Sequence, residues 1–83
     1  MEMKGRTYQT KSIELASFLL SKGYSLIKTE LNGNGRVIFV FTVKSGIETD
    51  IQEFNSGTAL VKVKDIFSSI SRIKGLIWDH RRK

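Results

Sequence analysis

Cysteine is absent from this chain of 83 residues, and histidine occurs once. Without cysteine, neither a disulfide framework nor a thiolate metal site can form, and the absence fits a reducing cytoplasm. No apolar run approaches the roughly 18 residues of a membrane-spanning helix. Residues 1–11 are polar, where a signal peptide would carry an apolar segment. We therefore expect a cytoplasmic protein that has no membrane segment.

Acidic residues are scarce relative to basic ones: 8 Asp and Glu stand against 14 Lys and Arg, and the formal net charge is +6. The basic excess is greatest in residues 58–83, whereas residues 44–57 are locally acidic. This distribution favours attraction to polyanions and does not bear on the fold. The apolar fraction, 40%, and the length suit one globular domain over residues 1–83, with residues 1–6 as a loose tail.

Two apolar runs joined by Asn32-Gly33-Asn34-Gly35 form the strongest local pattern. Asn-Gly turns accept the backbone angles of tight hairpins, so residues 24–31 and 37–43 predict a β-hairpin. The second run is apolar on both faces. We therefore expect it near the middle of a sheet, covered on both sides by helices or by a second subunit.

Three further segments show a helical pattern. Residues 13–20 present one apolar face, and Gly23 is placed to end that helix. Ser45-Gly46-Ile47-Glu48 matches a capping box, and Gly57 is placed to close the helix that follows. Asp65 is a suitable cap for a last helix, whose apolar stripe is formed by Ile66, Phe67, Ile70, Ile73 and Ile77.

In residues 58–63, Ala59, Val61 and Val63 alternate with Leu60 and Lys62, and this pattern predicts a third strand. Thr7 to Gln9 is either a short edge strand or an entry segment. The predicted fold class is α+β: a small single-layer β-sheet, made of the hairpin plus a third strand, packed with three helices in the order α-β-β-α-β-α.

The chain resembles a known family. Tyr8-Gln9-Thr10-Lys11 leads into an apolar helix that ends in Lys22-Gly23-Tyr24. An Asn-Gly turn, Val37-Ile38-Phe39-Val40-Phe41 and Phe54-Asn55-Ser56-Gly57 follow. This order resembles a family of small uncharacterised domains, a "domain of unknown function" found in bacteria and their mobile elements. The resemblance implies a compact α+β unit, often encoded near phage or plasmid functions, with no catalytic residue to carry over.

Residues that could carry chemistry have simpler interpretations. His80 shares no helical face with Asp79 or Ser71, so it is expected to be solvated. Asp50 and Glu53 lie on the polar face of a helix, where carboxylates are usually solvated. The glycine-rich turn runs from strand to strand, whereas phosphate-binding loops lead into a helix. We therefore predict no catalytic residue, no metal, no cofactor and no enzymatic activity.

The candidate binding surface combines basic residues with aromatic ones. It consists of Lys62, Lys64, Arg72, Lys74, Trp78, Arg81, Arg82 and Lys83, together with Arg36, which could reach a phosphate, and Phe18, at the margin of an apolar arc. Trp78 borders the last apolar stripe, so a core position is the competing interpretation.

Two functions from different classes fit this surface. The leading hypothesis is a protein-interaction adaptor or inhibitor in a phage or mobile-element setting. The alternative is a nucleic-acid-associated domain, in which Lys and Arg neutralise phosphates and Trp78 stacks on a base. We also expect a homodimer, because a second subunit would cover the apolar strand.

Overall fold

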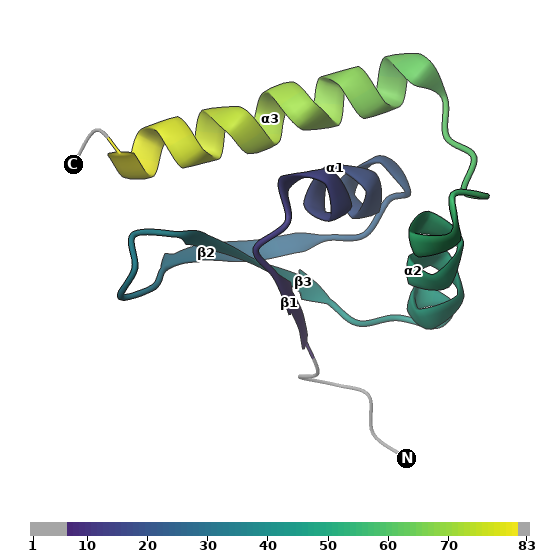
Figure 1. Ribbon diagram of the computed structural model, residues 1–83, viewed down its shortest axis with the longest axis horizontal. Helices are drawn as coiled ribbons and strands as arrows, with labels where there is room; N and C mark the ends of the chain where they lie inside the picture. The colour runs from purple at the N-terminus through teal and green to yellow at the C-terminus, as the bar shows by residue number, and fades with distance from the viewer. Residues whose placement is uncertain (1–6, 82–83) are drawn as a thin grey trace.

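The computed structural model describes residues 7–81, apart from the side chain of Arg81. The predicted tail at residues 1–6 lies outside this range. A three-stranded antiparallel sheet and three helices confirm the predicted α+β class. In Figure 1, α1 and α3 lie on the same side of the sheet, and α2 lies beyond one end of it. The elements are β1 (Thr7–Thr10), α1 (Ile13–Ser21), β2 (Leu26–Leu31), β3 (Val37–Thr42), α2 (Ile47–Ser56) and α3 (Val63–Arg81).

The second strand of the hairpin, β3, is the central strand, as its apolar character predicts. The strand order is β1-β3-β2, and both pairings are antiparallel. In the β1 register, Tyr8 lies opposite Phe41 and Thr10 lies opposite Phe39. Of the two interpretations open for the N-terminal segment, the edge strand is therefore the correct one.

The expected third strand at residues 58–63 is wrong, and the element order is β-α-β-β-α-α. Both sides of β3 are already occupied by β1 and β2, so no central ladder position remains for this segment. Its alternation has another cause. Ala59 and Val61 pack against the core, whereas Leu60 is 86% exposed.

The hairpin turn is built as its sequence predicts. The Asn32 side-chain oxygen Oδ1 accepts hydrogen bonds from the backbone N–H groups of Asn34 (2.9 Å) and Arg36 (3.0 Å). Gly35 has φ of +80°, a left-handed conformation that costs little without a Cβ atom. These contacts hold the start of β3 in a defined position.

The N-termini of α2 and α3 differ from the prediction. No capping box forms at α2: its N-cap is Gly46, in the left-handed region, and it has no side-chain cap. A glycine with φ of +94° places the chain where Ser45 cannot act as the N-cap. The last helix begins at Val63, so Asp65 lies within its first turn, where a negative charge suits the helix dipole. Gly23 and Gly57 follow their helices as predicted.

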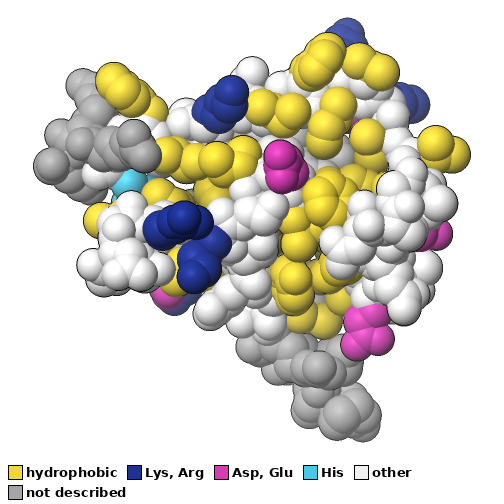
Figure 2. All heavy atoms as spheres, viewed as in Figure 1, with side chains coloured by type: hydrophobic (Ala, Val, Ile, Leu, Met, Phe, Trp, Pro, Cys, Tyr) yellow, Lys and Arg dark blue, Asp and Glu magenta, His cyan; other side chains and the backbone are white. Residues whose placement is uncertain are grey.

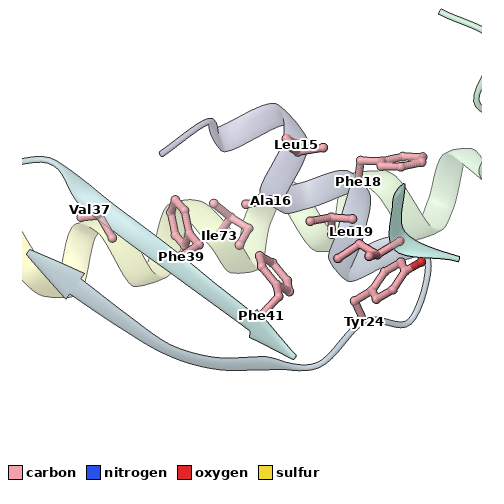
Figure 3. Close-up of a cluster of buried hydrophobic side chains, with 10 residues drawn as sticks. Leu15, Ala16, Phe18, Leu19, Tyr24, Val37, Phe39, Phe41 and Ile73 are labelled. Atoms are coloured by element: carbon pink, nitrogen blue, oxygen red, sulfur yellow. The ribbon is translucent and has the colours of Figure 1, made fainter. Parts of the chain in front are cut away.

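The core lies between the sheet and the helices (Figure 3). Phe39 and Phe41 from β3, Leu19 from α1 and Ile73 from α3 are fully buried. Burial of side chains of this size contributes about 1.5–3 kcal/mol each. The core therefore depends on contacts between segments that are distant in sequence.

The opposite face of β3 is covered within the single chain. Val40 is buried, and its cross-strand neighbours are Gln9 on β1 and Lys28 on β2. Lys28 also forms an ion pair with Glu30 at 2.9 Å. Long polar side chains can cover apolar surface with their stems. Val40 is therefore buried without a second subunit. On this face of β3, the expected cover by helices or by a partner chain is wrong. Within residues 7–81, no helix has the length and apolar character needed to cross a membrane.

Candidate binding surfaces

Trp78 is a surface residue, 61% exposed, so the competing core interpretation is wrong. Phe67, which was expected in the apolar stripe, is 64% exposed as well. Phe67, Lys74 and Trp78 are spaced i, i+7 and i+11 on α3, which places them on one side of the helix. We call these three residues the outer stripe of α3. Figure 2 shows hydrophobic and Lys or Arg side chains side by side along this helix.

The other basic residues of the predicted binding surface do not form one patch within the described structure. Lys62 precedes α3, Lys64 lies in its first turn, and Arg72 lies near its middle; all three are exposed. Arg36 lies at the distant hairpin turn and lines the same cavity as Lys11, which is described below. The side chain of Arg81, and Arg82 and Lys83 altogether, lie outside the described residues.

Phe18 does not belong to an exposed surface. It is 3% exposed, and its ring packs against Phe54 of α2 with the ring centroids 5.2 Å apart. The margin of a helical face can be buried by a later element, and here α2 supplies that cover. The predicted contribution of Phe18 to a binding surface is therefore corrected to a core position beneath a groove.

An apolar groove lies where α1, α2 and the start of α3 meet. Its volume is about 290 Å³. Among its lining residues, all within the described part of the chain, Glu14 alone carries a charge. Figure 2 shows the corresponding band of hydrophobic side chains, which runs from α3 down between α1 and α2. Its apolar lining is formed by Phe18, Phe54, Ala59, Val61, Ile66 and Ile70.

Exposed apolar side chains adjoin this groove. Leu60 lies between the lining residues Ala59 and Val61. Val63 and Phe67 are spaced i and i+4 on α3, and Ile70 follows at i+7, so they continue the apolar lining toward solvent. A contiguous exposed apolar surface of this kind marks an interaction site more often than scattered single residues do.

Ser17 is a further lining residue that the sequence pattern misplaced. Helical periodicity puts it on the polar face of α1, but it is fully buried. Its hydroxyl has no hydrogen-bond partner within the described structure. A buried hydroxyl without a partner costs about 1–3 kcal/mol. Nothing in the local sequence signals this position.

The predicted solvated groups make tertiary contacts instead. His80 Nε2 lies 2.6 Å from Thr29 Oγ1, which joins the end of α3 to β2. The Tyr24 hydroxyl donates to Asp50 Oδ2 at 2.5 Å. The Lys44 ammonium lies 4.8 Å from the Tyr24 ring centroid. The expectation of a solvated His80 is therefore wrong, and of the pair Asp50 and Glu53 only Glu53 is exposed as expected.

The contact between Tyr24 and Asp50 joins the segment between α1 and β2 to α2. Tyr24 is 4% exposed. Its burial, together with the hydrogen bond to the Asp50 carboxylate and the charge of that group, raises the pKa of Tyr24 to about 12. The neutral phenol is therefore favoured, and the contact serves structure. Nowhere in residues 7–81 do three His, Cys, Asp or Glu side chains gather as metal ligands would.

A family model for a domain of unknown function, DUF5659, matches residues 5–79 of the chain. The chain belongs to the DUF5659 family. The match confirms the resemblance to a domain of unknown function, while the association of DUF5659 with bacteria and mobile elements stays a prediction. A search of curated proteins and a search of solved structures each found no match.

Proposed function

We propose that this chain is a small non-catalytic binding domain that docks on another protein, as an adaptor or an inhibitor. The observation that carries the proposal is the apolar groove, which opens to solvent beside Leu60, Val63 and Phe67. A folded chain gains little by leaving such residues exposed unless they make contacts elsewhere. A phage or mobile-element setting and a cytoplasmic location are part of the proposal.

The charges around the groove suggest the chemistry of the partner. Glu14 lines the groove, and α2 carries Glu48, Asp50 and Glu53 but no basic residue. An apolar partner segment that also bears Lys or Arg would fill the groove and pair with Glu14. Such complementary charges increase association rates and select partners more than they increase affinity.

Affinity capture from a lysate of the source organism, treated with nuclease, tests this proposal. The groove variant carries Leu60→Ser and Phe67→Ser. The matched control carries Ile27→Ser and Leu31→Ser, which replace two comparably exposed apolar residues on β2. We expect the wild type and the control to capture the same protein and the groove variant to lose it. Equal capture by both variants, or loss of all capture after nuclease treatment, would contradict the proposal.

Reversing the charge of Glu14 provides a second test of the groove. Glu14→Lys should weaken capture of the same protein and make it less sensitive to salt, because the attraction to a basic partner segment is removed. Glu30→Lys is the control, since Glu30 lies on β2, away from the groove, and pairs with Lys28. A partner that responds equally to both variants would show that only the net charge matters.

The second candidate function is nucleic-acid association, and the exposure of Trp78 favours it. An exposed aromatic residue flanked by Lys74 on the same side of α3 can stack on a base while the lysine contacts a phosphate. In that case, binding of a single-stranded oligonucleotide should fall steeply with salt. Trp78→Ala should weaken it by about 1–3 kcal/mol. Fluorescence anisotropy across a salt series measures both effects, and no binding at low salt excludes this candidate.

A further inference from the structure

A second cavity, which we call the hairpin cavity, shares no lining residue with the apolar groove. It lies between the β2–β3 turn, the start of α1 and the C-terminal half of α3, and its volume is about 400 Å³. Small-molecule sites commonly measure about 300–1,000 Å³. One part of its lining is apolar and consists of Ile13, Val37, Phe39 and Ile77.

The polar part of the hairpin cavity is basic. Lys11 and Arg36 line it together with Asn34, and none of its lining residues is acidic. The ion pair found in residues 7–81, Lys28 with Glu30, involves neither cation. Two positive charges that line one cavity without a carboxylate attract an anion, and an arginine can bind two oxygens of one phosphate at once.

A backbone donor adds to these two cations. The Arg36 carbonyl accepts a hydrogen bond from the Asn32 N–H at 2.9 Å, so the backbone of Arg36 faces β2. Backbone groups alternate along an antiparallel strand, so the N–H of Val37 faces the β1 side. The β1 register ends where Thr10 lies opposite Phe39, so no β1 residue pairs with Val37. Among residues 7–81, its N–H therefore has no backbone partner, and Val37 and Lys11 both line the cavity.

We propose that the hairpin cavity binds a phosphate monoester that also carries a flat ring, as a nucleoside monophosphate does. The faces of the ring, which can pack on apolar side chains, are its apolar body. The dianionic phosphate meets Lys11, Arg36 and the Val37 N–H. The apolar body lies against Ile13 and Ile77. A single carboxylate would leave one of the two cations unneutralised, so phosphate is the better match. This inference goes beyond the protein-docking function and does not depend on it.

Titration of the ¹⁵N-labelled protein with AMP, followed by NMR, tests the proposal at low salt. We expect the amide signals of Gly35, Arg36 and Val37 to shift. Adenosine, which lacks the phosphate, and inorganic phosphate, which lacks the apolar body, should each bind at least about tenfold more weakly. Absence of AMP-dependent shifts at millimolar concentration would overturn the proposal.

Matched variants make the test specific to the cavity. Lys11→Gln and Arg36→Gln should each weaken AMP binding by about tenfold, whereas Arg72→Gln and Lys74→Gln, which remove charges elsewhere, should leave it unchanged. All four positions are exposed, so each variant is expected to keep the wild-type spectrum in the absence of ligand. Equal loss of binding in all four variants would show a response to net charge and refute the site.

The source of the phosphate is decided by a further arm of the same experiment. An oligonucleotide with a 5′-phosphate and the same oligonucleotide with a 5′-hydroxyl are compared with AMP. If the 5′-phosphorylated oligonucleotide binds more tightly than AMP and the 5′-hydroxyl oligonucleotide, the cavity binds the 5′ end of a nucleic acid. Tighter binding of AMP assigns it to a free nucleotide. Tighter binding of the 5′-hydroxyl strand than of the phosphorylated strand contradicts the proposal.

Discussion

Tyr24→Phe is expected to destabilise the protein in a way that depends on pH. The substitution keeps the buried ring and removes the hydroxyl that donates to Asp50. A hydrogen bond to a charged group contributes about 1.5–3 kcal/mol. Asp50 is only partly buried, and water can replace part of the lost bond, so we expect a cost of about 1.5 kcal/mol at neutral pH. In a domain of this size, that corresponds to a fall in Tm of roughly 6–12 °C.

The pH dependence follows from the raised pKa of Tyr24, about 12 in the folded protein against 10.0 for the free side chain. Below pH 10 the phenol is neutral in both states, and its contribution to stability is complete. Between pH 10 and 12 the unfolded chain loses this proton first, so the free energy of unfolding falls. The total loss through this window is at most about 2–3 kcal/mol.

Urea unfolding, followed by circular dichroism between pH 8 and pH 11, measures this effect. The wild type should lose its advantage over Tyr24→Phe as the pH rises. Tyr8→Phe is the control, because Tyr8 lies on β1 opposite Phe41, and its hydroxyl makes no hydrogen bond to a carboxylate within the described residues. A difference between the wild type and Tyr24→Phe that stays constant up to pH 11 would refute the assignment.

Three other predictions concern packing and assembly. Phe39→Ala removes a fully buried ring from the central strand and should cost about 3–5 kcal/mol; an unchanged Tm would contradict its core position. Ser17→Ala removes a buried hydroxyl without a partner in the described structure, so it should leave stability unchanged or raise it by about 1 kcal/mol; a clear loss in urea unfolding would reveal a hidden hydrogen bond. Because Val40 is covered within the single chain, light scattering at high protein concentration should give the monomer mass of 9.4 kDa; twice that mass would show that the homodimer forms for another reason.

Local patterns predicted the elements whose cause is local. The Asn32-Gly35 turn, the glycines after α1 and α2, and the presence of helices α1 and α3 depend on neighbouring residues, and the structure confirms them. The capping box failed because a left-handed glycine starts α2. This choice of cap is decided by the path of the chain after β3 and not by the Ser-Gly-Ile-Glu pattern.

The missing strand shows what alternation can and cannot predict. Alternating apolar residues in 58–63 indicate which side chains face the core, and Ala59, Leu60 and Val61 follow that pattern. The pattern carries no information on whether a ladder position is free. Here β1, which precedes residues 58–63 by about 50 positions, pairs with β3 in their place.

The candidate sites were only partly predictable for the same reason. Exposed basic residues and Trp78 could be recognised from composition and spacing. The apolar groove needed the positions of α1, α2 and α3 relative to one another. The burial of Phe18 depends on Phe54, and the contact of Tyr24 with Asp50 joins residues 26 positions apart. No local signal carries such information.

The connection between α2 and α3 makes the chain vulnerable at one point. Residues 58–62 are outside any helix or strand, and Leu60 projects into solvent. Exposed connections of this kind are preferred sites of proteolytic cleavage. A protease that cuts beside Leu60 would produce two fragments, and the second, containing α3, would carry Ile73 of the core. The two fragments should therefore stay associated in solution after cleavage, because each carries part of the same core.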